Sequence, residues 1–377
     1  MPIGIAVFEV LNHRVHPQMK TSIVLGTRPE IIKFSPIIRE CELLGLDYFI
    51  LHTGQHYSYN MDRVFFEQLE LPNVKHNLEI GSGSHAEQTG KMLIGIEKVL
   101  RKEKPDLVLV EGDTNTVLAG ALAAAKLGVR VGHVEAGLRS YDRRMPEEIN
   151  RVLTDHCSDF LFAPTEKSRQ TLLREGIARE KIFVTGNTVV DAVSQNLEIS
   201  KSKMSILDIM KLSPGRYFAA TIHRQENVDD ERRLSGIVEG LVRVRRDFGL
   251  ELVYPVHPRA RKLLKKFRLE PRDVTLVEPL DYLSFLQLEA NARLVLTDSG
   301  GVQEETCILK VPCVTLRDNT ERPETLDVGA NVLAGTDPDK IVEMVKLMFG
   351  KDINWENPFG DGKAGKRIIE ILRREFD

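Results

Sequence analysis

Three carboxylates of this chain are placed so that they could act together as acids and bases. Asp113 and Glu135 each follow a short apolar run, and Glu147 follows Pro146 at a predicted helix start. Carboxylates grouped in a cleft raise one another's pKa, which prepares them to exchange protons near neutral pH. Each one alone is better explained as a helix cap or an ion-pair partner. The three together favour catalysis.

A second stretch, LVLTDSGGVQEETCIL at 294–309, predicts an anion site. An apolar run at 294–297 predicts a strand, a turn follows, and a helix is expected over 302–309. Ser299, Gly300 and Gly301 would present unpaired backbone N–H groups at the helix start, where the helix dipole favours a phosphate. Glu305, expected in the first turn, could accept both hydroxyls of a ribose. Together these features indicate a nucleotide, although a tight β–α turn explains Ser-Gly-Gly equally well.

Cationic side chains accompany another predicted helix start. Arg28 and Lys33 lie at its two sides and could neutralise an anion. The alternative is that Arg28 pairs with Glu30 and that Lys33 is solvated. We favour a functional role for Arg28 and leave Lys33 open.

Basic groups also follow two later strands. His223 and Arg224 would suit a diphosphate leaving group, because imidazole and guanidinium both donate to phosphate oxygens. His257 is placed similarly, but Pro258 after it makes a structural role almost as plausible. The density of histidine and carboxylate could indicate a metal instead. No short ligand spacing such as HExxH occurs, so we expect no metal.

These residues follow predicted strands that alternate with predicted helices. Apolar, largely β-branched or aromatic runs indicate parallel strands covered on both faces, and hence an α/β fold. Strands are expected at 21–25, 48–51, 107–110, 129–134, 160–163, 217–221, 252–255, 274–277, 294–297 and 313–316. Helices are expected at 30–44, 61–69, 88–102, 116–127 and 147–158. Ligands of open α/β sheets bind outside the carboxyl ends of the strands, so two such sheets should face each other across a cleft.

The chain length of 377 residues fits two domains. We expect a dispensable extension at 1–18, a first domain carrying the carboxylates at 19–187, and a second, nucleotide-binding domain at 188–362. A polar helical stretch is expected over 200–212. The segment 363–377 is expected to form a helix that packs back on the first domain.

Composition restricts the classes of partner. Hydrophobic residues make up 42% of the chain and charged residues 28%, as in a globular protein. The formal net charge of -3 gives no reason to expect a nucleic acid or an anionic membrane as partner. Four scattered cysteines suggest buried thiols of a cytoplasmic protein, without disulfides. No apolar run approaches the length of a membrane span.

Seven blocks of the chain together resemble the non-hydrolysing UDP-N-acetylglucosamine 2-epimerases. They are GTRPE (26–30), EGDT (111–114), HVEAGLR (133–139), PEEINR (146–151), TIHRQEN (221–227), DSGGVQEE (298–305) and RDNTERPE (317–324). The resemblance runs in order from about residue 20 to the C-terminus. One departure is Ile222, which stands between Thr221 and His223 where the family has a plain Thr-His step.

The resemblance implies a glycosyltransferase type B fold, in which two Rossmann-like doubly wound domains hold the UDP-sugar between them. It implies no metal, no nicotinamide and, we expect, a homodimer. UDP would be eliminated with loss of the C2 proton to give a 2-acetamidoglucal, and then added back after reprotonation on the other face. The acid/base group would be Asp113, Glu135 and Glu147, and a fourth catalytic residue, His223, would lie with the cations around the diphosphate. Substrate and UDP binding would fall to Arg28, Lys33, Arg224, His257, Val277, Glu278, Ser299, Gly300, Gly301, Glu305 and Arg322, with the turn at 276–280 contacting uracil.

One loop bears on regulation and on the identity of the sugar. Many bacterial members of this family bind a second UDP-N-acetylglucosamine as activator, partly through a Gln-His-Arg loop. Here the loop reads GQHYSYNMD at 54–62, which keeps Gln55 and His56 but replaces the arginine-containing continuation. This version also resembles relatives that act on modified UDP-amino sugars, including a uronic acid and 6-deoxy sugars. Both the activator site and the exact sugar are left open.

The first hypothesis is therefore reversible epimerisation of UDP-N-acetylglucosamine to UDP-N-acetylmannosamine, or the same reaction on a modified UDP-2-acetamido sugar. A hydrolysing epimerase would instead release N-acetylmannosamine and UDP. A retaining glycosyltransferase would need an acceptor. A nucleotide-sugar sensor would bind without turnover.

Overall fold

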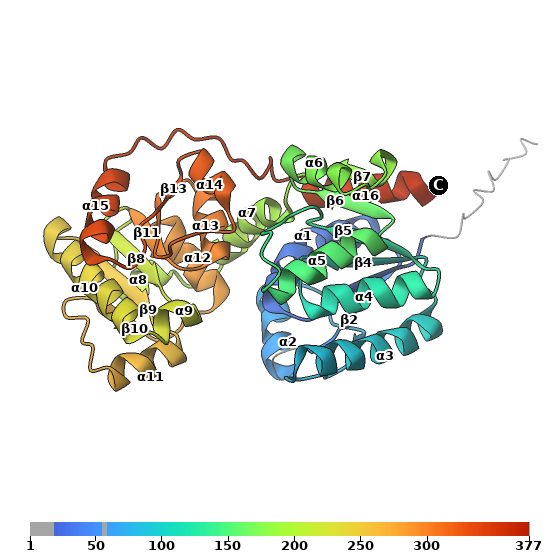
Figure 1. The fold of residues 1–377 in the computed structure, drawn as a ribbon, viewed down its shortest axis with the longest axis horizontal. Coiled ribbons are helices and arrows are strands. Elements are labelled where there is room, and N and C mark those ends of the chain that lie inside the picture. Colours follow the sequence, from blue (N-terminus) through green and yellow to red (C-terminus); the bar gives the residue numbers. More distant parts are fainter. Residues whose placement is uncertain (1–18, 55–58, 377) are drawn as a thin grey trace, which may run out of the picture.

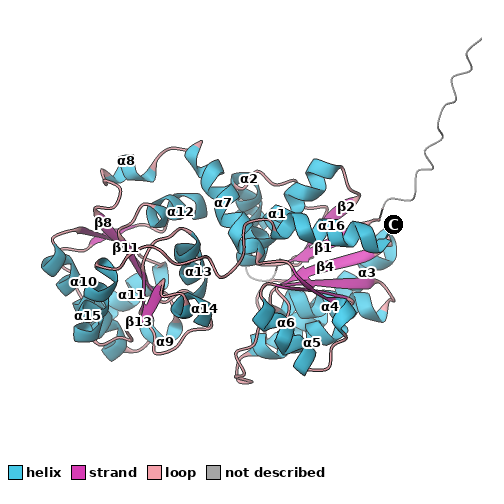
Figure 2. Ribbon diagram, turned by 90° about the horizontal axis from the view of Figure 1, so that it is seen from above, coloured by secondary structure: helices cyan, strands magenta, loops and turns pink. Residues whose placement is uncertain are grey.

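The computed structural model describes residues 19–54 and 59–376, which form two lobes, each built around one sheet (Figures 1 and 2). The predicted extension at 1–18 and the candidate regulatory residues Gln55 and His56 lie outside the described residues. Within the described ranges, no helix has both the length and the apolar character needed to cross a bilayer. Cys41, Cys157, Cys307 and Cys313 are all free thiols.

Each lobe contains one fully parallel sheet with helices on both faces. The first sheet has the order β3-β2-β1-β4-β5-β6-β7, and the second has the order β10-β9-β8-β11-β12-β13. The strands of the first sheet are β1 (Thr21–Leu25), β2 (Tyr48–His52), β3 (His76–Asn77), β4 (Leu107–Glu111), β5 (Arg130–Val134), β6 (Phe160–Ala163) and β7 (Ile182–Val184). Those of the second are β8 (Tyr217–Thr221), β9 (Glu251–Pro255), β10 (Thr275–Val277), β11 (Leu294–Thr297), β12 (Cys313–Thr315) and β13 (Asn331–Leu333).

Both sheets are wound in the same way. The chain enters at a central strand, moves out to one edge, and crosses back to build the other edge. The strand order therefore reverses between β1 and β4 in one lobe and between β8 and β11 in the other. Such switch points are where doubly wound sheets bind ligands, and the predicted two Rossmann-like domains are confirmed.

Helices surround both sheets (Figure 1). The first lobe contains α1 (Arg28–Leu44), α2 (Tyr59–Gln68), α3 (His85–Glu103), α4 (Asn115–Lys126), α5 (Pro146–Cys157) and α6 (Glu166–Arg174). The second contains α9 (Gln225–Val228), α10 (Glu231–Phe248), α11 (Pro258–Lys266), α12 (Tyr282–Ala290), α13 (Gly300–Ile308), α14 (Pro323–Asp327) and α15 (Pro338–Phe349). The strands are almost entirely buried between them, which explains their apolar sequences. The ten predicted strand ranges agree with observed strands, but β3, β7 and β13, which are two or three residues long, are not among them.

The predicted helical stretch at 200–212 is wrong. Helix α7 (Thr188–Lys201) ends at Ser202, and a separate short helix, α8 (Ile206–Met210), begins after Ser205. Ser205 accepts a hydrogen bond from Asp208 N at 3.3 Å, as an N-cap does. The polar pattern of 200–212 continues across the break, so the sequence did not indicate it.

Two helices connect the lobes. Helix α7 packs against α1 of the first lobe and against α12 and α13 of the second. Helix α16 (Ala364–Phe376) follows the second lobe in sequence but packs on α1, beside the first sheet (Figure 1). Its start is held by Asp191 of α7, which accepts from Ala364 N at 3.2 Å and Gly365 N at 3.0 Å.

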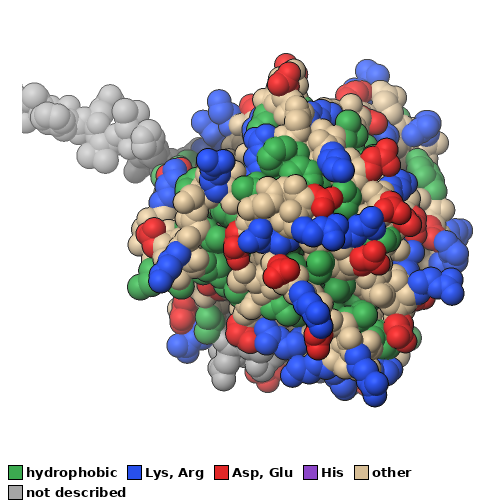
Figure 3. All heavy atoms as spheres, turned by 90° about the vertical axis from the view of Figure 1, so that its left-hand side faces the viewer, with side chains coloured by type: hydrophobic (Ala, Val, Ile, Leu, Met, Phe, Trp, Pro, Cys, Tyr) green, Lys and Arg blue, Asp and Glu red, His purple; other side chains and the backbone are tan. Residues whose placement is uncertain are grey.

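The outer face of the second lobe carries positive and negative side chains that are interspersed (Figure 3). No single-sign patch dominates this face of the described chain. The mixed charge agrees with the small formal net charge of -3.

Candidate active site

The first-lobe side of the site begins with three charged groups at the ends of β1, β4 and β5. Glu111 is the last residue of β4 and pairs in register with Val134, so Glu135 lies directly beyond it. Lys33 of α1 reaches both carboxyl groups, with Nζ 2.6 Å from Glu135 Oε2 and 3.4 Å from Glu111 Oε1. The alternative of a solvated Lys33 is therefore wrong. Glu111 was not among the predicted site residues, although it ends the same strand that positions Asp113.

Glu135 is held in an uncommon backbone conformation with φ of 71°. A non-glycine residue in this region is strained, and such strain concentrates at functional sites. Asn187 Nδ2 donates to Glu135 Oε1 at 3.0 Å. Burial would raise the pKa of Glu135, but Lys33 and Arg322 outweigh it and hold that pKa well below its usual range. Glu135 is therefore ionised at neutral pH.

Helix α5 supplies a second group of charges. Arg151 forms ion pairs with Asp113 and, at 2.8 Å, with Glu148 Oε2. Asn150 Nδ2 donates to the carbonyl of Asp113 at 2.9 Å, which fixes that loop. Glu147 lines the cleft, and its side chain has no hydrogen bond or ion pair within the described ranges.

A buried network supports the loop that carries Glu135. His133 contacts Asp155 through Nδ1 at 2.6 Å and the carbonyl of Gly112 through Nε2 at 2.9 Å. Asp155 also accepts from Gly137 N at 3.2 Å. Gly137 has φ of 83°, and a Cβ there would lie 2.5 Å from the carbonyl oxygen of Ser168. Only glycine fits this turn, so the HVEAG sequence shapes the loop as well as supplying the carboxylate.

The second-lobe side begins at the start of α13. This helix begins at Gly300, two residues earlier than predicted, and Ser299 Oγ accepts from Val302 N at 3.4 Å. Asp298 is fully buried and accepts from the backbone N–H groups of His223 and Arg224, at 3.1 and 3.0 Å. The loop after β8 is thereby fixed to the loop after β11. The structure places Arg224 in the cleft lining, whereas His223 contacts Asp298 and lies outside that lining.

The predicted position of Glu305 in the first turn of α13 is wrong, because it is the sixth residue of the helix. It lies buried beside Tyr282 and Glu289, and burial raises its pKa to about 7. The carboxylate of this helix that lines the cleft is Glu304, which pairs with Arg322 Nε at 2.8 Å. Helical spacing from Gly300 could have found Glu304, because residues four apart share a face.

The two lobes enclose a cleft of about 420 Å³. Of the predicted site residues, its lining contains Lys33, Asp113, Glu135, Glu147, Arg224, Ser299, Gly300, Gly301 and Arg322. Five further charged residues that sequence reasoning did not assign to the site also line it: Glu30, Glu111, Arg151, Glu304 and Glu321. Carboxylates of the first lobe thus face helix N–H groups and arginines of the second.

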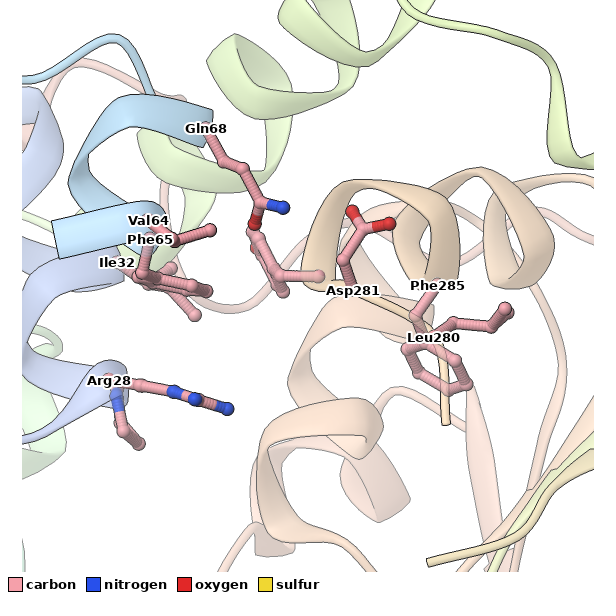
Figure 4. Close-up of a pocket in the computed structure, with 10 residues that line it drawn as sticks. Arg28, Ile32, Val64, Phe65, Gln68, Leu280, Asp281 and Phe285 are labelled. Atoms are coloured by element: carbon pink, nitrogen blue, oxygen red, sulfur yellow. The ribbon is translucent and has the colours of Figure 1, made fainter. Parts of the chain in front are cut away.

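A neighbouring hollow of about 600 Å³ shares Pro29 with this cleft. Arg28 and Phe65 border it from the first lobe, and Leu280 and Phe285 border it from the second (Figure 4). The Arg28 guanidinium lies over the Phe65 ring, 5.8 Å from its centroid. Arg28 is therefore brought to the hollow beside the cleft, and not into the cleft lining itself.

Three further predicted residues lie outside both cavity linings. His257 is exposed and caps α11, its Nδ1 accepting from Arg259 N at 3.3 Å, as the structural alternative expects. The carbonyl of Val277 accepts from Val256 N at 3.1 Å, and Glu278 pairs with Arg261 at 2.8 Å. Of the turn expected to contact uracil, Leu280 lines the hollow, and the contact itself stays a prediction. Across the described chain, no group of three histidine, cysteine or acidic side chains is placed to hold a metal ion.

Comparison with known families decides where this chain belongs. The family model described as UDP-N-acetylglucosamine 2-epimerase matches residues 40–373. The chain belongs to that epimerase family. The predicted resemblance is confirmed.

Several members of the epimerase family are close to this chain. The UDP-N-acetylglucosamine 2-epimerase of Methanocaldococcus jannaschii is 59% identical over 361 residues, covering 94% of this chain and 99% of that one. Its crystal structure in complex with UDP-GlcNAc and UDP superposes with a TM-score of 0.85, covering 94% of this chain and 100% of that one. The UDP-2,3-diacetamido-2,3-dideoxy-D-glucuronate 2-epimerase of Pseudomonas aeruginosa is 43% identical over 360 residues, covering 94% of this chain and 100% of that one. A glycosyltransferase of Rickettsia africae superposes with a TM-score of 0.57 at 12% identity, covering 96% of this chain and 99% of that one. At this identity the likeness shows the fold alone.

Proposed function

We propose that the protein interconverts UDP-N-acetylglucosamine and UDP-N-acetylmannosamine by eliminating UDP and adding it back. The observation that carries this proposal is the cleft, in which carboxylates of one lobe face anion-binding groups of the other. The M. jannaschii relative, whose structure holds UDP-GlcNAc and UDP, supports a UDP-sugar as substrate.

The second lobe would hold the diphosphate. Backbone N–H groups at Gly300 and Gly301 open toward the cleft at the start of α13, and Arg224 lies beside them, its Nη2 3.8 Å from where a Cβ of Gly300 would be. A helix N-terminus and a guanidinium both favour phosphate oxygens. The hollow lined by Arg28 and Phe285 would take the nucleoside, because apolar and aromatic walls suit a base.

The first lobe would move the proton. The C2 proton of the sugar has no adjacent carbonyl to acidify it, so its removal needs a base and a well-neutralised leaving group together. The base takes the proton from C2, the C–H electron pair forms the C1–C2 double bond, and the C1–O bond breaks with its pair leaving on UDP. Asp113, Glu135 and Glu147 are the proposed acid/base group. Glu147, whose carboxylate has no partner within the described ranges, suits a group that must take up and release a proton.

Retention of UDP would separate this reaction from hydrolysis. The glycal can be converted back only if UDP stays bound while C2 is reprotonated on the other face. A cleft enclosed by both lobes excludes water during that interval, and the groups at the start of α13 would keep UDP in place. His223 would act on the diphosphate side, from its position against Asp298.

The deciding experiment is incubation with UDP-N-acetylglucosamine in heavy water, followed by NMR of the products. The proposal expects both epimers with deuterium at C2 and no accumulation of free sugar. Stoichiometric UDP and free N-acetylmannosamine would instead identify a hydrolysing epimerase. Tight binding without turnover would identify a sensor, and turnover only with an added acceptor would identify a glycosyltransferase.

A second candidate substrate is a UDP-2-acetamido sugar with a modified ring. The 43% identity to the P. aeruginosa epimerase, named for a diacetamido glucuronate, favours testing it. The same heavy-water assay with UDP-2,3-diacetamido-2,3-dideoxy-D-glucuronate, run beside UDP-N-acetylglucosamine, compares the two by kcat/KM. A homodimer, a cytoplasmic location and a regulatory site at Gln55 and His56 stay predictions.

A further inference from the structure

Glu111 is a buried carboxyl group at the centre of the cleft, and the proposed reaction gives it no role. Its side chain is 2% exposed, and its Oε1 lies 3.4 Å from Lys33 Nζ. The same ammonium group lies 2.6 Å from Glu135 Oε2, so the two carboxyl groups are held side by side. Two carboxyl groups therefore share one ammonium group in a largely buried position.

Among the described residues, Arg322 is the second cation that acts on Glu135, but its guanidinium is already paired with Glu304. The other side chains that face the two carboxyl groups are matched as follows: Glu304 with Arg322, Asp113 with Arg151, and Glu30 with the N–H groups of Gly26 and Thr27 and the hydroxyl of Thr114. If Glu111 and Glu135 were both ionised, their cluster with Lys33 would carry one excess negative charge. An unmatched charge in a low-dielectric site is costly, so one carboxyl group keeps its proton.

The contacts assign that proton to Glu111. Glu135 has the closer ammonium group, at 2.6 Å, and accepts from Asn187 at 3.0 Å, both of which stabilise its carboxylate. Among the described residues, the only cation or donor in contact with the Glu111 carboxyl group is Lys33, at the longer distance of 3.4 Å. A hydrogen bond between two carboxyl groups needs one donor, and the group with the poorer set of cations and donors supplies it. Burial and the proximity of Glu135 raise the pKa of Glu111 well above its usual range, in agreement with this assignment.

We propose that Glu111 is a positioning residue, kept as a neutral acid that donates its proton to Glu135 and leaves the cluster with Lys33 uncharged. The consequence for the reaction rests on the proposed function, because an uncharged cluster matters when an anionic diphosphate enters the cleft. Ionisation of Glu111 would withdraw the hydrogen bond that orients Glu135. It would also add a negative charge that repels the diphosphate. UDP binding should therefore favour protonated Glu111 and take up a proton at alkaline pH.

The primary test is calorimetric titration of the whole protein with UDP, from about pH 6 to about pH 10, in buffers of different ionisation heat. For the wild type we expect affinity to fall on the alkaline side, with uptake of up to about one proton there. Glu111→Gln keeps a neutral N–H donor that cannot ionise, so this uptake should be lost and the alkaline decline should flatten. Asp191→Asn, which alters another buried carboxyl group outside both cavity linings, should keep the wild-type uptake.

Turnover provides the second readout. Glu111→Ala removes the donor, whereas Glu111→Gln restores it without charge, so the glutamine variant should turn over at least about tenfold faster than the alanine variant. Equal turnover of the two variants, or unchanged proton uptake in Glu111→Gln, would overturn the assignment.

A ligand-free measurement separates this inference from the proposed function. In wild-type protein carrying ¹³C-labelled glutamate, one side-chain carboxyl resonance that titrates above neutral pH should be missing from Glu111→Gln. If the Glu111→Gln spectrum lacks that resonance but UDP does not bind to the wild type, the proposed function is wrong and the assignment of a neutral Glu111 is upheld. If UDP binds and no such resonance is lost, the inference is wrong and the proposed function stands.

Discussion

Asn187 donates a hydrogen bond of 3.0 Å from Nδ2 to Oε1 of Glu135. The same side chain caps α7, its Oδ1 accepting from Val189 N at 3.0 Å. Because α7 packs against both lobes, one amide joins a candidate catalytic carboxylate to the connection between the lobes. The two contacts differ in chemistry: the cap needs an acceptor, and Glu135 needs a donor.

Substitution of Asn187 can therefore separate catalysis from stability. Asn187→Ser keeps a capping oxygen but is too short to reach Glu135, whereas Asn187→Ala loses both contacts. We expect both variants to lower kcat by about tenfold, since Glu135 loses an orienting donor. Only the alanine variant should also lose about 1 kcal/mol of unfolding free energy, measured by urea denaturation. Wild-type turnover in Asn187→Ser would show that the contact does not matter for the reaction.

The three carboxylates of the cleft should each be needed for proton transfer. We expect Asp113→Asn, Glu135→Gln and Glu147→Gln each to lower turnover by about a hundredfold or more, because an amide cannot exchange the proton. The rate of deuterium incorporation at C2 measures this. Glu166→Gln, on the exposed face of α6, is the matched control and should turn over like the wild type. Any cleft variant that keeps the control rate does not belong to the acid/base group.

Glu30 should make stability depend on pH. It is buried, and burial raises its pKa from 4.5 to about 7, although hydrogen bonds from Thr114, Gly26 and Thr27 favour the charged form. Between these values the folded protein keeps a proton that the unfolded chain has released. The contribution of Glu30 to stability is therefore complete below about pH 4.5 and is lost as the pH rises through 7, by roughly 3 kcal/mol.

Glu30→Gln should remove this contribution. Glutamine can keep the capping box of α1 but cannot ionise, so the decline in unfolding free energy between about pH 4.5 and pH 7 should become shallower. Urea denaturation of both proteins at several pH values measures the difference in slope. Parallel curves for the two proteins would contradict a titrating Glu30.

Helix α16 should stabilise the first lobe although it follows the second in sequence. Leu372 is fully buried in the core that also contains Phe34 and Ile37 of α1. Leu372→Ala should lower the unfolding free energy by roughly 2–5 kcal/mol, through lost burial and the cavity left behind. The neighbouring Arg373→Ala is exposed and should change it by less than about 0.5 kcal/mol. A similar effect of both substitutions would mean that α16 is not packed as described.

The local sequence was sufficient for most of the elements. Apolar runs at 21–25 and 107–110 predicted buried strands, and loops at the carboxyl ends of parallel strands lie at one edge of the sheet. The position of Asp113, Glu135 and Ser299 at such edges followed from this rule. The break between α7 and α8 was missed because Ser205 can continue a helical pattern or cap a new helix, and local sequence does not distinguish the two.

Only the tertiary structure decided which charged groups contact one another. Lys33 and Glu135 are 102 residues apart, yet Nζ and Oε2 lie 2.6 Å apart at the carboxyl edge of the first sheet. No periodicity or spacing encodes such a contact, because it depends on how α1 packs on the sheet. For the same reason Glu305, which was expected to accept the ribose hydroxyls, is buried beside Glu289, whereas Glu304 reaches the cleft. The sequence alone determined the two sheets and the sheet edges at which the candidate site residues lie. This is because the burial of a strand depends on its local sequence, and its direction depends on how it is connected to the neighbouring strand. The partners of each carboxylate, and hence its charge, follow only from the folded arrangement, because they depend on desolvation and on residues brought from distant parts of the chain.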